Sequence, residues 1–106
     1  MKVFVSGKIT GEPILQCVKK FNDARKKIFG TDEFNLVRRD DIIVPIELTG
    51  IVFGISNNDA MSICFKALRE CDAIYMLSDW ENSPGARLEH SQAKDWGLQL
   101  YYQDKK

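Results

Sequence analysis

Several features that mark particular protein classes are scarce in this sequence. Its 106 residues include three cysteines and a single histidine. Cys17, Cys64 and Cys71 form an odd set without CxxC spacing, so we expect neither a disulfide framework nor a zinc site. His90 directly follows Glu89, which does not fit an HExxH metal site, and we expect it to be solvated or hydrogen-bonded. These absences predict a reduced, cytoplasmic protein that uses no metal and no organic cofactor.

Excess charge and long apolar runs are also absent. Fifteen Lys and Arg residues balance 15 Asp and Glu residues, so no net field attracts a nucleic-acid backbone or an anionic membrane. No apolar run approaches the roughly 20 residues that span a bilayer. The first strand-like segment begins at Lys2 without the basic leader and apolar region of a signal peptide. We expect one domain over 1–106, with no nucleic-acid and no membrane partner.

Strand-like and helix-like segments alternate along the chain. Short β-branched or aromatic runs predict strands at Lys2–Val5, Ile42–Val44, Ala73–Leu77 and Leu98–Tyr102. Apolar residues at three- and four-residue spacing predict three helices. These run from Pro13 to just before Gly30, from a cap at Asn58 or Asp59 to about Cys71, and from Pro84, capped by Ser83, to about Trp96. The stretches 31–41 and 47–58 have no clear period.

The order of these segments predicts an α/β fold. Strands that alternate with helices through short connections imply right-handed crossovers and a parallel sheet covered on both faces. We expect a three-layer α/β/α sandwich of the flavodoxin-like or Rossmann-like type, with a four-stranded parallel sheet of order 2-1-3-4. Ligands bind such sheets beyond the carboxyl ends of the strands, where the winding direction reverses. The expected site therefore lies between the loops Ser6–Gly11 and Ser78–Pro84.

Both loops are rich in small residues that hydrogen-bond. In the first, Ser6 precedes Gly7, and in the second, Ser83 begins a helix whose free N–H groups and dipole favour an anion such as phosphate. The glycines Gly7 and Gly85 are equally explained as residues that permit tight turns. No Walker loop or GxGxxG motif is present. Trp80 is the aromatic residue best placed to stack on a nucleobase.

Glu89 is the most informative residue of the third helix. It shares one helical stripe with Ala86, Ala93 and Trp96, which places a carboxylate on the side that faces the sheet. A carboxylate there is costly to desolvate unless it is paired or used, and burial raises its pKa. Two explanations remain open from the residues alone: a functional carboxylate, or a structural one that is paired with Arg87 or Lys8 or takes a mobile position at the edge of the stripe.

Three segments carry a resemblance to a known superfamily: VFVSGKITG at 3–11, CDAIYML at 71–77 and WENSPGARLEH at 80–90. With these segments the chain resembles nucleoside 2-deoxyribosyltransferase-like proteins, in particular their small phage and bacterial branch. The resemblance covers nearly the whole chain and is weak from 31 to 58. It implies an enzyme that cleaves or exchanges the N-glycosidic bond of a 2′-deoxynucleoside or its monophosphate. Glu89 would attack C1′ of the deoxyribose and release the base.

The resemblance also implies binding roles for residues of both loops. Ser83 and Gly85 match positions that hold a 5′ phosphate or hydroxyl group. Gly7, Lys8 and Ile9 would lie near the sugar or the phosphate. The expected partner is therefore a small-molecule nucleoside or nucleotide. Because relatives complete their sites with neighbouring subunits, a homo-oligomer is expected.

One position departs from the superfamily's pattern. The accessory Asp on the helix before the central strand falls at Cys64, and a thiol cannot replace a carboxylate in catalysis. Asp59 and Asp79 are the candidates that could replace it in catalysis. The departure leaves a second possibility open, a non-catalytic nucleotide-binding or regulatory module on the same fold. A third is a structural protein that associates through its aromatic Tyr101-Tyr102 tail.

Overall fold

The computed structural model describes residues 2–8, 13–29, 41–44 and 57–103. Its elements, in chain order, are β1 (Val3–Ser6), α1 (Ile14–Phe29), β2 (Ile42–Ile43), α3 (Asn57–Arg69), β3 (Ala73–Met76), the 3-10 helix η4 (Trp80–Asn82), α4 (Pro84–Asp95) and β4 (Gln99–Tyr102). All the expected strands and helices are therefore present, with small shifts at their ends.

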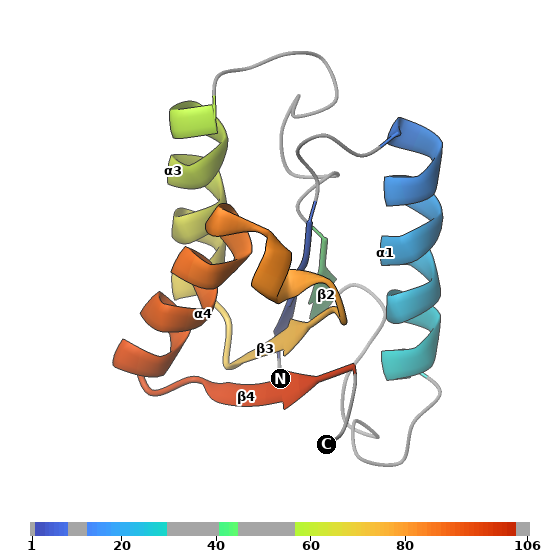
Figure 1. The fold of residues 1–106 in the computed structure, drawn as a ribbon. Coiled ribbons are helices and arrows are strands. Elements are labelled where there is room, and N and C mark those ends of the chain that lie inside the picture. The colour runs from blue at the N-terminus through green and yellow to red at the C-terminus, as the bar shows by residue number, and fades with distance from the viewer. Residues whose placement is uncertain (1, 9–12, 30–40, 45–56, 104–106) are drawn as a thin grey trace.

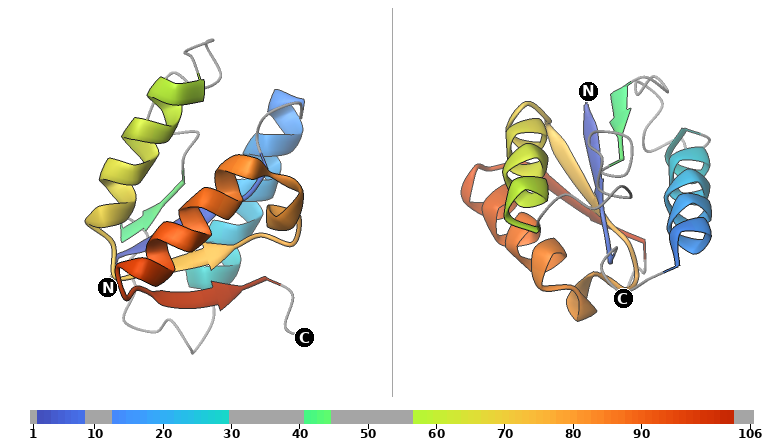
Figure 2. Two further views of the ribbon diagram at one scale, coloured as in Figure 1. Left: turned by 60° about the vertical axis from the view of Figure 1, so that its left-hand side comes forward. Right: turned by 90° about the horizontal axis from the view of Figure 1, so that it is seen from above.

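The sheet is parallel throughout and has the strand order β2-β1-β3-β4. This is the predicted order 2-1-3-4. The central pair runs in register from Val3 beside Ala73 to Ser6 beside Met76. Helix α1 covers one face of the sheet, and α3 and α4 cover the other (Figures 1 and 2), so the molecule has the three layers expected from the sequence. The strand order reverses its winding between β1 and β3, and the loops that follow these two strands lie at one edge.

Two apolar cores fill the spaces between the layers. Because strand side chains alternate between faces, Val3 and Val5 pack toward α1, whereas Phe4 packs toward α3 and α4. The α1 side is completed by helix residues such as Phe21 and Ile28. The same alternation places Ser6, two residues after Phe4, on the α3 and α4 side of the sheet.

Helix α4 has the ends that its sequence predicts. The Ser83 hydroxyl accepts a hydrogen bond from the Ala86 N–H at 3.2 Å, and Pro84 is the first helical residue. The helix ends at Asp95, and Gly97 beyond it has a φ of 76°, which favours glycine. The cap and the direction of this helix decide where its buried face meets the sheet.

The start of α3 differs from the prediction. The sequence predicts a cap at Asn58 or Asp59, but the helix begins at Asn57 and both residues lie within its first turn. Short polar residues suit that turn as well as the cap, because several N–H groups there lack helical partners. Within the described residues, no helix combines the length and apolar character needed to cross a membrane.

Candidate functional site

The candidate site is centred on a hydrogen bond between β1 and α4. The Ser6 hydroxyl donates to Oε1 of Glu89 at 2.6 Å, and only 5% of the Glu89 residue surface is exposed. The expected sheet-facing orientation of this carboxylate is confirmed. The alternative explanation, an ion pair, is wrong for the described residues. No described cation, Arg87 and Lys8 included, lies within ion-pair distance of Glu89. The Ser6 hydroxyl is therefore engaged in a hydrogen bond to Glu89.

The environment of Glu89 shifts its ionisation toward neutral pH. Burial raises the pKa of Glu89 from 4.5 to about 7, and hydrogen bonds with Ser6 and Cys64 oppose that rise. Burial, and then the neighbouring Glu89 carboxylate, raise the pKa of the Cys64 thiol to about 12. At neutral pH the carboxyl group is therefore divided between its two forms. The thiol stays protonated and remains a hydrogen-bond donor.

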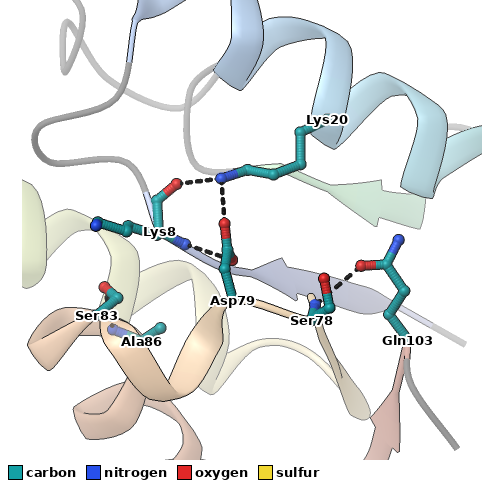
Figure 3. A network of polar contacts seen from close by, with 7 residues as sticks. All are labelled: Lys8, Lys20, Ser78, Asp79, Ser83, Ala86 and Gln103. Atoms are coloured by element: carbon teal, nitrogen blue, oxygen red, sulfur yellow. Dashed lines mark hydrogen bonds and ion pairs between the residues drawn. The ribbon is translucent and has the colours of Figure 1, made fainter.

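Asp79 ties the two site loops together (Figure 3). Its Oδ1 accepts from the Lys8 backbone N–H at 3.1 Å, and its Oδ2 pairs with the Lys20 ammonium at 2.6 Å. The same ammonium donates to the Lys8 carbonyl at 2.6 Å. Both carboxylate oxygens of Asp79 are thus engaged in linking the loop after β3 to the loop after β1 and to α1. The Lys8 side chain points away from this network.

Sequence reasoning did not find Lys20. The residue lies on α1 directly before the buried Phe21, at the border of the apolar stripe. A lysine at that border is a weak signal, because a long side chain there commonly covers apolar surface with its stem while the charge stays in water. Its acceptors, Asp79 and the Lys8 carbonyl, become its neighbours only through the fold.

The two glycines of the site lie in tight surroundings. A Cβ atom on Gly7 would lie 2.6 Å from Cδ1 and 2.9 Å from Cβ of Leu77. A Cβ atom on Gly85 would lie 3.1 Å from the sulfur atom of Met61 on α3. Gly7 therefore allows the chain after β1 to approach the end of β3. That packing role is established by geometry, whether or not Gly7 also contacts a ligand.

The N-terminus of α4 satisfies part of its own hydrogen bonding. Ser83 caps the Ala86 N–H with its hydroxyl and accepts from the Arg87 N–H with its carbonyl group at 2.9 Å. Pro84 has no N–H group. Among the described residues, the Gly85 N–H has no acceptor. An anion at this helix end would therefore meet the Gly85 amide first.

Trp80 belongs to an aromatic cluster between η4, α4 and β4. Its ring stacks on His90, with centroids 4.3 Å apart and planes 26° apart, and Nε2 of His90 lies 2.7 Å from the Tyr102 hydroxyl. Burial, and then Lys94, lower the pKa of His90. The expected hydrogen-bonded histidine is confirmed. Since one ring face of Trp80 lies against His90, stacking on a nucleobase would have to use the other face.

The structure does not describe the side chains of two predicted site residues, Ile9 and Asp59. Ile9 lies outside the described residues, and Asp59 is described only by its backbone in α3. Within the described part of the chain, no three His, Cys, Asp or Glu side chains gather as metal ligands would. The described site therefore consists of the Glu89 carboxyl group, the Ser6 hydroxyl that donates to it and the loops that Asp79 ties together.

Comparison with known proteins identifies a family for the chain. No curated protein and no solved structure matches it. One family model, described as a domain of unknown function (DUF4406), matches residues 1–102. Because this match takes in both site loops, every strand and all of α4, the protein belongs to the DUF4406 family.

Proposed function

We propose that the protein cleaves or exchanges the N-glycosidic bond of a 2′-deoxynucleoside or its 5′-monophosphate, with Glu89 as the nucleophile. The observation that carries the proposal is the buried Glu89 carboxyl group, which Ser6 holds at the carboxyl end of β1 and which has no described cationic partner. A buried, uncompensated carboxylate costs stability, and such costs concentrate at functional sites. The superfamily resemblance of the flanking segments supports the same role.

The reaction would proceed by two displacements at C1′ of the sugar. The ionised Glu89 carboxylate attacks C1′, the bond from C1′ to the base nitrogen breaks, and its electron pair remains on the base, which takes a proton from a nearby acid or, where none is in reach, from water. In the second step a water molecule or another nucleobase attacks C1′ and the bond to Glu89 breaks. The proton of the attacking group passes to solvent. A carboxylate nucleophile divides the substitution into two easier steps, as in retaining glycosidases.

The loops would bind the rest of the substrate. The unoccupied Gly85 amide and the helix dipole of α4 suit a 5′ phosphate or hydroxyl group, and the Lys8 side chain would add a positive charge. Trp80 would contact the base with its outer face. Asp79 has both oxygens engaged, so we assign it to holding the loops. Asp59 remains the candidate acid for protonating the departing base.

A second function, a non-catalytic nucleotide-binding module, is favoured by one observation. A leaving base is normally protonated by an acid near the scissile bond. Among the described groups, Asp79 is tied to Lys20, and the pKa of the Cys64 thiol is about 12, too high for an efficient acid. A site with a nucleophile but without an acid would bind nucleotides and turn them over slowly or not at all.

One assay separates the two functions. The protein is incubated with each deoxynucleoside and each 5′-monophosphate, and free base is followed by chromatography, with binding measured by calorimetry. Base release that Glu89→Gln lowers at least about a thousandfold, and that Glu81→Gln on the exposed η4 leaves unchanged, supports the enzyme. Saturable binding without release supports the module. Neither release nor binding would overturn both.

A further inference from the structure

One ion pair holds both backbone polar groups of Lys8 at the edge of the site (Figure 3). The Lys8 N–H group donates to Oδ1 of Asp79 at 3.1 Å, and the Lys8 carbonyl accepts from the Lys20 ammonium at 2.6 Å. The same ammonium lies 2.6 Å from Oδ2 of Asp79. The three contacts therefore form a closed ring that joins the loop after β1, the loop after β3 and helix α1.

Asp79 does not use its carboxylate for the local role that its position suggests. It is the N-cap residue of η4, and an aspartate at a helix start commonly accepts a hydrogen bond from the first turn. The Asp79 side chain makes no such cap hydrogen bond. Both of its oxygens instead reach the segments that hold Lys8 and Lys20. The carboxylate thus connects distant parts of the chain and does not complete η4.

Lys20 makes these contacts in a partly dehydrated setting. The Lys20 side chain is 23% exposed and that of Asp79 24%. The Lys20 ammonium also lies 5.7 Å from the ring centroid of Phe21, which is fully buried. Water and salt screen such a pair less than a pair on the open surface. The adjacent Lys19 is exposed and takes no part in the three contacts.

We propose that Lys20 is a positioning residue, which holds Lys8 and its loop in the place where the substrate binds. This inference rests on the proposed function for its catalytic meaning. The Lys8 side chain points away from the ring of contacts, so the contacts fix its backbone without engaging its ammonium group. Glu89 lies on α4, across the sheet from α1. We therefore expect Lys20 to act on substrate binding and not on the chemical step.

The competing explanation is that Lys20 and Asp79 only stabilise the fold. A purely stabilising pair would change the opening of the whole sheet, whereas a positioning pair changes the opening of the loop alone. Amide hydrogen exchange, followed by NMR, separates the two residue by residue and needs no substrate. The Lys8 amide reports on the loop, and the amides of β1, which lies between β2 and β3, report on the sheet.

The variants remove one property at a time. Lys20→Met keeps a long apolar stem and loses the charge and the donor, whereas Lys20→Arg keeps both. Lys19→Met makes the same substitution at the exposed neighbour and serves as the control. Asp79→Asn, alone and combined with Lys20→Met, removes the ionic partner and leaves an acceptor for the Lys8 N–H group.

We expect Lys20→Met to speed exchange of the Lys8 amide about fivefold and to leave the β1 amides unchanged. For the deoxynucleotide that the wild type cleaves, KM should rise by about the same factor, with kcat changed less than about twofold. Lys20→Arg should restore most of both values, and Lys19→Met should match the wild type. In the Asp79→Asn background, Lys20→Met should have a smaller effect than it has alone.

Unchanged exchange of the Lys8 amide in Lys20→Met, or an equal rise in the β1 amides, would overturn the proposal. A fall in kcat with an unchanged KM would overturn it too, because Lys20 would then act on the chemical step. Faster exchange of the Lys8 amide alone, without base release from any of the proteins, would support the hold of Lys20 on the loop and refute the proposed enzyme.

Discussion

Gly7 shows how a single missing side chain shapes the site edge. A Cβ atom there would come within 2.6 Å of Leu77, which is fully buried. We expect Gly7→Ala to lower the free energy of unfolding by about 1–3 kcal/mol, because either the backbone after β1 or the Leu77 side chain must shift. Urea unfolding followed by circular dichroism measures this loss.

A double-mutant cycle distinguishes this contact from a general backbone effect. Leu77→Ala removes the nearest of the contacts that an added Cβ atom would make, although it leaves the Cβ atom of residue 77 at 2.9 Å. The double variant should therefore lose less stability than the two single variants added together. Strictly additive losses would show that the outer atoms of the Leu77 side chain, Cγ and Cδ1, do not cause the loss of stability in Gly7→Ala.

The sequence predicts single residues well where a short period decides their position. Glu89 faces the sheet as its spacing from Ala86 and Ala93 requires, and all three are buried. Trp96 lies at the end of the same stripe, as the residue that caps α4, but is 39% exposed. The partner Ser6 lies 83 residues from Glu89 in the chain, so the hydrogen bond itself could not be predicted from local spacing.

At the scale of an element, α4 carries most of the candidate site and depends on its cap. Ser83 accepts from the Ala86 N–H in a buried setting, so Ser83→Ala leaves that donor without its partner. We expect a loss of about 1 kcal/mol in the free energy of unfolding, within the range of about 0.5–2 kcal/mol for such caps. Chemical denaturation measures the loss, and Ser83→Thr should restore most of it.

Ser91→Ala serves as the control, because Ser91 is exposed within the same helix. Alanine has the higher helix propensity there, so that variant should be as stable as the wild type or slightly more stable. Equal losses in Ser83→Ala and Ser91→Ala would show that the hydroxyl of Ser83 does not cap the helix.

Element order and type were predictable because each segment has its own period and its own stop signals. Within the described residues, the four strands and three helices follow from the alternation of periods, and the parallel pairing follows from the crossover rule. The order 2-1-3-4 is that of the expected flavodoxin-like type. The 3-10 helix η4 was not predicted, since a three-residue element has no period to detect. The first turn of α3 was misplaced because Asn57, Asn58 and Asp59 suit neighbouring positions at a helix start equally well.

On the scale of the whole molecule, side chains from both faces of the sheet contribute to the site edge. Glu89 and Cys64 belong to the helices on one face, whereas Lys20 reaches Asp79 from α1 on the other face (Figures 1 and 3). The loops between these layers therefore depend on contacts that only the assembled three-layer fold provides. Global stability should accordingly respond to the ionisation of the one buried carboxyl group among the described residues.

Glu89 makes that response testable through its raised pKa. The folded chain binds this proton with a pKa of about 7, against an ordinary value of 4.5, so protonation favours the folded state. The stabilisation is complete below about pH 4.5 and is lost as the pH rises through about 7. A glutamine stays neutral at every pH. We expect Glu89→Gln to match the wild type near pH 4.5 and to be more stable at pH 8.5, by at most about 3 kcal/mol.

Urea unfolding of both proteins between pH 4.5 and 8.5 checks this expectation, and Glu81→Gln controls for the loss of a carboxylate. Glu81 is exposed on η4, so its substitution should change stability little and equally at all these pH values. A stability difference between Glu89→Gln and the wild type that stays constant with pH would contradict the raised pKa. It would mean that the carboxyl group of Glu89 titrates alike in the folded and unfolded chains, and hence that the native site is open to water.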